Sequence, residues 1–79
     1  MKLFTIYDSK CEAYEPPISI KSTGEALRAV EIAVKEPDHR FCKYKADLTL
    51  YELGEFNEQT GLLHLYETKK HIMNLSSFN

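Results

Sequence analysis

The sequence predicts an α+β fold, in which one amphipathic helix packs on an antiparallel sheet. Segments that alternate apolar and polar residues, as strands do, lie both before and after one segment with the three- and four-residue spacing of a helix. Strands grouped on either side of a single helix are typical of an α+β domain and not of a parallel βαβ fold. The chain has 79 residues, which leaves room for one domain over residues 1–79.

The N-terminal part predicts two strands. Residues 2–7 are rich in β-branched and aromatic side chains and end at a turn-forming Asp-Ser-Lys sequence. Pro16 and Pro17 favour extended backbone, and a second strand is expected at residues 18–21. Because proline cannot donate to a ladder, this strand should lie at or near an edge of the sheet.

The helix is expected to begin at a capping box formed by Ser22 and Glu25, with Thr23 as the alternative cap, and to end before Pro37. Ala29 and Ile32 lie beside its main apolar stripe, where they either widen the core-facing stripe or contact a second copy of the chain. The residues of the main stripe recur at steps of three and four: Ala26, Leu27, Val30, Ala33 and Val34.

The C-terminal half predicts a hairpin. Residues 38–47 have no clean period and are expected to form a loop with a short turn, and alternation returns from Leu48 to Leu53. Gly54 is expected to mark a bulge, residues 57–61 a hairpin loop with Gly61 at positive φ, and residues 62–67 the return strand. The tail, residues 68–79, either docks as a short strand or helical turn or is frayed.

One helix covers one face of a sheet, so the other face is expected to be polar, to pair with another subunit or to be used for binding. The aromatic side chains predicted to line it are Phe4, Tyr7, Tyr51 and Tyr66. The acidic residues near the hairpin are interpreted as a solvated rim that limits edge-to-edge aggregation. They are Glu52, Glu55, Glu58 and Glu67.

Several classes of function are not expected. The three histidines show no metal-ligand spacing, and the three glycines form no phosphate-binding loop, so neither a metal nor a cofactor is predicted. Cys11 and Cys42 are interpreted as reduced thiols. One sheet and one helix rarely enclose a catalytic pocket, which argues against an enzyme. No segment predicts a signal peptide or a membrane span, so an intracellular protein is expected.

A basic-aromatic run is the candidate binding site. Cations beside exposed rings suit single-stranded nucleic acid, because phosphates pair with the cations while bases stack on the rings. Alternatively, Phe41 and Tyr44 anchor the loop to the core and the lysines are merely solvated. The formal net charge of −2 requires any DNA-binding surface to be local. The predicted site comprises Arg40, Phe41, Lys43, Tyr44 and Lys45, joined by Lys69 and Lys70.

Two segments resemble a known family. Residues 7–14 with Pro16 resemble the start of the small nonstructural proteins of gokushovirus-type microviruses, which are phages with single-stranded circular DNA genomes. Residues 24–29 resemble that family's helix start, and residues 50–57 followed by Thr60-Gly61 resemble its hairpin. The similarity covers residues 1–67, although residues 43–48 depart from the family's pattern in the proposed contact loop.

The resemblance implies a DNA-binding or replication-associated accessory protein that acts in the host bacterial cytoplasm, in the switch to single-strand synthesis or packaging. We therefore expect binding of single-stranded DNA, with a homodimer doubling the site. The alternative is a protein-interaction module that regulates the phage replication initiator or capsid assembly. The resemblance transfers no individual functional residue.

Overall fold

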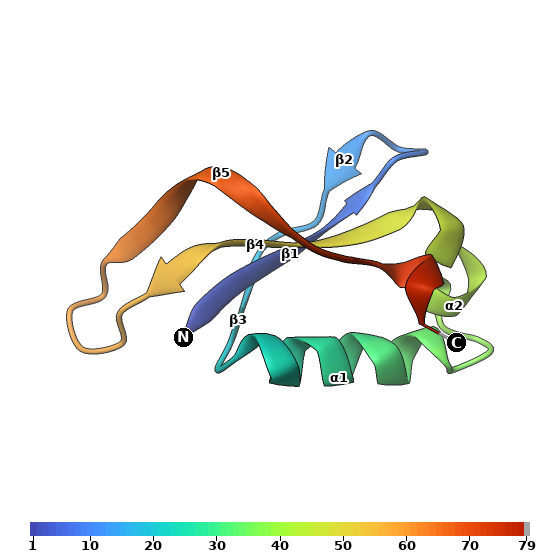
Figure 1. The fold of residues 1–79 in the computed structure, drawn as a ribbon, viewed down its shortest axis with the longest axis horizontal. Coiled ribbons are helices and arrows are strands. Elements are labelled where there is room, and N and C mark those ends of the chain that lie inside the picture. Colours follow the sequence, from blue (N-terminus) through green and yellow to red (C-terminus); the bar gives the residue numbers. More distant parts are fainter. Residues whose placement is uncertain (79) are drawn as a thin grey trace.

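The computed structural model describes residues 1–78 and confirms the α+β fold, with a five-stranded antiparallel sheet and one main helix on one of its faces (Figure 1). The central strands are β1 (Lys2–Asp8) and β4 (Leu48–Phe56), and β5 (Leu63–Asn74) forms one edge. The other edge of β1 is shared by β2 (Ala13–Tyr14) and β3 (Ile18–Ile20). The predicted edge strand after the prolines is thus confirmed as β3, whereas β2 was not predicted.

Helix α1 (Thr23–Val34) begins where the sequence predicts. Ser22 is the N-cap, and its side chain accepts a hydrogen bond from the backbone N–H of Glu25 at 3.2 Å. Ala26, Val30 and Val34 are buried. They form the core with Phe4 and Ile6 of β1, Leu48 and Leu50 of β4, and Leu75, which follows β5. Phe4 was predicted on the open face, and that prediction is wrong, because alternation along β1 turns it toward α1 with Ile6.

The segment predicted as a loop contains two short helices. α2 (Arg40–Lys43) is capped by His39, whose Nδ1 accepts from the backbone N–H of Phe41 at 3.0 Å, and the 3₁₀ helix η1 (Lys45–Asp47) follows. Phe41 packs against the core, which fixes α2 beside the end of α1 (Figure 1). Sequence periodicity cannot reveal helices this short, because four residues contain barely one turn.

Strand β5 is longer than predicted and includes most of the tail. It continues to Asn74 and is followed by the 3₁₀ helix η2 (Leu75–Ser77), in which Leu75 is fully buried. The alternative of a docked tail is therefore confirmed over residues 68–78, and Asn79 lies outside the described residues.

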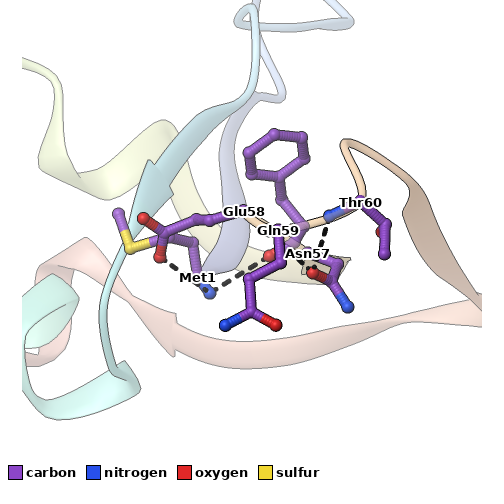
Figure 2. A network of polar contacts seen from close by, with 6 residues as sticks. Met1, Asn57, Glu58, Gln59 and Thr60 are labelled. Carbon is purple, nitrogen blue, oxygen red and sulfur yellow. Dashed lines mark hydrogen bonds and ion pairs between the residues drawn. The ribbon is translucent and has the colours of Figure 1, made fainter.

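The hairpin between β4 and β5 is confirmed, with Gly61 at a φ of 74°. Asn57 Oδ1 accepts from the backbone N–H groups of Gln59 and Thr60, and the amino group of Met1 lies 3.9 Å from a carboxylate oxygen of Glu58 (Figure 2). The hairpin extends past the N-terminal end of α1, so the helix does not cover it (Figure 1). These contacts hold the loop in a defined conformation.

Candidate functional site

An aromatic cluster lies on the sheet face opposite α1. Tyr7 pairs with Tyr14 across β1 and β2, and Tyr51 pairs with His71 across β4 and β5. Because Thr5 stands opposite Tyr51 in the ladder of β1 and β4, Tyr7 and Tyr51 share a face, which is the opposite face from Ile6 and Leu50. Ring centroids are 4.5 Å apart for Tyr7 and Tyr14, 6.2 Å for Tyr14 and Tyr51, and 5.8 Å for Tyr51 and His71.

A lysine from an arch in β5 completes this cluster. The ladder passes from the pair Gly54–Leu65 directly to the pair Glu52–Lys70, so residues 66–69 of β5 have only Leu53 of β4 opposite them. They bend away from the sheet, on the side opposite α1 (Figure 1). Lys69 Nζ lies 5.4 Å from the ring centroid of Tyr14 and 5.2 Å from that of Tyr51. We call Tyr7, Tyr14, Tyr51, Lys69 and His71 the open-face cluster.

The cluster combines a retained positive charge with accessible rings. The hydroxyl of Tyr14 next to the ammonium group raises the pKa of Lys69, so the lysine is charged at neutral pH. The Tyr14 side chain is 48% exposed, while Tyr7 and Tyr51 are half-buried. An exposed ring beside a cation offers one face for stacking and one charge for an anionic group.

The predicted basic-aromatic run has a different setting. Arg40 forms an ion pair with Glu15, which raises the pKa of Arg40, and its guanidinium carbon lies 4.7 Å from the ring centroid of Phe41. Phe41 packs on the core, as the alternative interpretation of the run proposed. Lys43 and Tyr44 are exposed, the latter by 56%. Arg40 is also exposed, but its charge is paired, so fewer groups of the run are free to bind a ligand than the sequence suggests.

The two lysines that were grouped with this run face opposite sides of the sheet. Lys69 belongs to the open-face cluster, whereas Lys70 stands opposite Glu52, on the side of α1. The structure thus separates Lys69 and Lys70 and places α2 beside the end of α1. Lys45 is half-buried in η1.

Glu52 is not part of a solvated rim, and that prediction is wrong. Its side chain is 1% exposed and accepts hydrogen bonds from Tyr66 Oη at 2.5 Å and from Thr23 Oγ1 at 3.0 Å, with Lys2 Nζ 3.7 Å away. Burial pushes the pKa of Glu52 upward, but these hydrogen bonds and the nearby lysines Lys2 and Lys70 outweigh it, so the pKa is lowered. Tyr66, which was predicted on the open face, is instead held by this carboxylate.

Sequence reasoning missed Tyr14 as a site residue and found Tyr7 and Tyr51. The alternation of apolar and polar residues placed Tyr51 on the open face, but the prolines after Tyr14 suggested only a stiff connection. The short ladder between β1 and β2 brings Tyr14 onto Tyr7, and only two residue pairs form it. A tyrosine before an extended proline pair, close in sequence to an aromatic strand, is the weak signal that was available.

The remaining predicted residues can also be located. Ala29 and Ile32 are exposed on α1, Ile32 by 60%, and their role in a dimer stays a prediction. Over residues 1–78, no group of three or more His, Cys, Asp and Glu side chains is placed to hold a metal ion. No helix among the same residues is long and apolar enough to cross a membrane.

The fold and the open-face cluster define a small α+β protein with an accessible aromatic and cationic sheet face. A family model described as Phage ORF5 protein matches residues 1–78, and the chain belongs to this family. No curated protein and no solved structure matches the chain. The chain is therefore a phage protein. The narrower resemblance to gokushovirus-type microviruses stays a hypothesis.

Proposed function

We propose that the protein is a non-enzymatic phage accessory protein that binds single-stranded DNA in the host cytoplasm through the open-face cluster. The observation that carries the proposal is the position of Lys69 Nζ, within 5.4 Å of the ring centroids of Tyr14 and Tyr51 on the sheet face that no helix of residues 1–78 covers (Figure 1). A base stacks on the exposed ring of Tyr14, and the ammonium group pairs with the adjacent phosphate. The family membership supports a phage accessory role.

The open-face cluster supports this proposal better than the predicted run around α2 does. Arg40 is exposed but ion-paired with Glu15, and Phe41 packs on the core, so Lys43 is the exposed cation of that surface without an ion pair among residues 1–78, and Tyr44 is its exposed ring. In the open-face cluster the cation and two rings already lie together, so less side-chain entropy is lost on binding. The duplex is a poorer ligand, because its bases are stacked internally and cannot reach a tyrosine ring.

Two similarly exposed tyrosines provide a matched test. Tyr14→Ala should weaken binding of a fluorescein-labelled oligothymidylate by about 1–3 kcal/mol, roughly 5- to 150-fold, because one stacking platform is lost. Tyr44→Ala, which removes a ring exposed to a similar degree, should leave binding nearly unchanged. Fluorescence anisotropy at low and moderate salt measures both. If Tyr44→Ala weakens binding and Tyr14→Ala does not, the site is the surface around α2.

The charge of Lys69 is tested through salt dependence. Lys69→Gln should flatten the dependence of log K on log salt concentration by about 0.7 for a single strand, since one phosphate contact is lost. Lys43→Gln is the control and should keep the slope of the wild-type protein. Absence of binding at micromolar protein, or binding that does not change with salt, would reject single-stranded DNA as the ligand.

A protein-interaction role is the second candidate function, and a specific observation favours it. Leu62, Leu63 and Leu65 are exposed at the hairpin. The hairpin extends beyond the end of α1 and so lies away from the helix (Figure 1). The two functions use different surfaces, so one does not exclude the other.

A further inference from the structure

We infer that the hairpin between β4 and β5 is a docking site for an extended, basic and apolar segment of another protein. The inference does not rest on DNA binding by the open-face cluster. We call residues 53–65 the arm. It comprises the end of β4, the loop closed by Asn57 and Gly61, and the start of β5 (Figure 1).

The first observation is an ordered but exposed apolar surface on the arm. Leu62, Leu63 and Leu65 are 69%, 59% and 60% exposed. Their backbone is held in place, because Asn57 N–H donates to Leu62 O at 2.9 Å and Phe56 pairs with Leu63 in the ladder. Three large exposed side chains within four residues of fixed backbone form a patch, unlike single apolar residues scattered over a surface.

The second observation is a free strand edge beside these leucines. β5 pairs with β4 along one side, and no strand of residues 1–78 pairs with its other side. Edge strands usually carry lysine or proline that discourages pairing with another chain. Here neither residue type occurs between Lys45 and Lys69. The outward backbone groups of residues 63–65 can therefore accept an added strand.

The third observation identifies the chemistry of the partner. Glu55 and Glu58 lie on the arm, which contains no Lys or Arg, and Glu67 follows it, ahead of Lys69 and Lys70. The N-terminal ammonium group lies near Glu58, but no ion pair within residues 1–78 holds Glu55 or Glu67. A segment with lysine or arginine among apolar residues complements this surface. Two arms facing each other would oppose like charges, which argues against a second copy.

A concavity at the arm suits a long cationic side chain. It has a volume of about 910 Å³, and its lining includes Met1, Phe56 and Leu63 together with both carboxylates, Glu55 and Glu58. Figure 2 shows Met1 and the loop residues around Glu58. The aliphatic part of a lysine or arginine can contact the apolar lining while its charged end reaches a carboxylate. A phosphate backbone would meet repulsion at the same place.

The test uses a fluorescent peptide that alternates lysine and valine, titrated with the full chain and followed by anisotropy. Leu63→Thr combined with Leu65→Thr should weaken binding at least tenfold, since the substitutions remove the apolar contact but keep residues that favour strands. Ile18→Thr is the matched control, because Ile18 is 58% exposed in the edge strand β3, and it should bind as the wild-type protein does. Circular dichroism checks that each variant is folded.

Charge and location are tested separately. Glu55→Gln combined with Glu58→Gln should weaken peptide binding and reduce its salt dependence, and a glutamate–valine peptide should not bind. Bound peptide should slow amide hydrogen exchange at residues 63–65. The inference would be overturned if the lysine–valine peptide bound the leucine variant as tightly as the wild-type protein, or if the acidic peptide bound as tightly as the basic one. Self-association of the protein that the leucine substitutions abolish would also overturn it. Loss of oligonucleotide binding in the leucine variant would overturn it as well, because the arm would then be part of the DNA-binding surface.

Discussion

At the scale of single residues, the most unusual environment is that of Glu52 and Tyr66. A carboxylate is rarely buried unless it is paired, and here Tyr66, Thr23 and Lys2 all contact it. The pair connects the arch of β5 to the beginning of α1 and to β1. Because Glu52 itself lies on β4, these contacts join four elements, and removing either side chain leaves a polar partner unsatisfied.

The phenol of Tyr66 should lose its proton at a higher pH than an ordinary tyrosine. Its hydrogen bond to Glu52 raises the pKa of Tyr66 from 10.0 to about 12, because ionisation would place a phenolate beside a carboxylate. Spectrophotometric titration of the folded protein should show a tyrosine component with a pKa near 12. Tyr66→Phe should remove this component. In Glu52→Gln the component should move back toward the ordinary value, and an unchanged value there would contradict the assigned cause.

At the scale of elements, the arch and the bulge between β4 and β5 shape the open face. Gly54 permits this geometry, because a Cβ at that position would lie 2.2 Å from the carbonyl oxygen of His64 and 2.8 Å from Leu65 Cα. The sequence indicated a bulge at Gly54 but not the arch that follows in β5. The arch depends on close backbone contact between β4 and β5, and a glycine in the sequence does not reveal how closely the facing strand approaches it.

Two glycine substitutions should have opposite effects on stability. Gly54→Ala should destabilise the fold by about 1–3 kcal/mol or more, because the contacts are with backbone atoms that cannot rotate away. Gly24 lies in the first turn of α1, where an added Cβ would lie 4.0 Å from Ser22 Oγ, so Gly24→Ala should stabilise the fold by about 0.5–1 kcal/mol. Urea denaturation measures both. Equal stability of the two variants would show that β5 does not lie this close to Gly54.

At the scale of the whole molecule, charge is divided between surfaces. The arm carries acids and leucines without a lysine or arginine, while Lys69 lies among tyrosines on the open face and Lys43 is exposed on α2. A net charge of −2 is thus compatible with a cationic binding surface.

The free energy of unfolding should decrease in acid because the buried carboxylate of Glu52 becomes protonated. The pKa of Glu52 is lower in the folded protein than its ordinary value of 4.5, so its contribution is present above pH 4.5 and is lost as the pH falls through the folded pKa. Asp8, whose pKa is lowered by the backbone N–H groups of Cys11 and Lys10, changes in the same direction. Glu52→Gln should be less stable at neutral pH by about 1–3 kcal/mol.

The pH series distinguishes this cause from general acid unfolding. Unfolding free energies of wild type and Glu52→Gln, measured from neutral pH down to acid, should converge as Glu52 becomes protonated. A constant difference between the two proteins would mean that the charge of Glu52 contributes nothing to the pH dependence.

Sequence patterns alone predicted the fold class, the start of α1, the edge strand after the prolines and the hairpin with Gly61. Each follows from local chemistry, namely the Ser22 cap, the apolar spacing, the prolines and a glycine at positive φ. The folded structure was needed to show that Glu52 is buried, that Tyr14 lies beside Tyr51 and that Lys69 and Lys70 lie on opposite faces of the sheet. These outcomes depend on how strands pair and where β5 bends, and residues distant in sequence fix both.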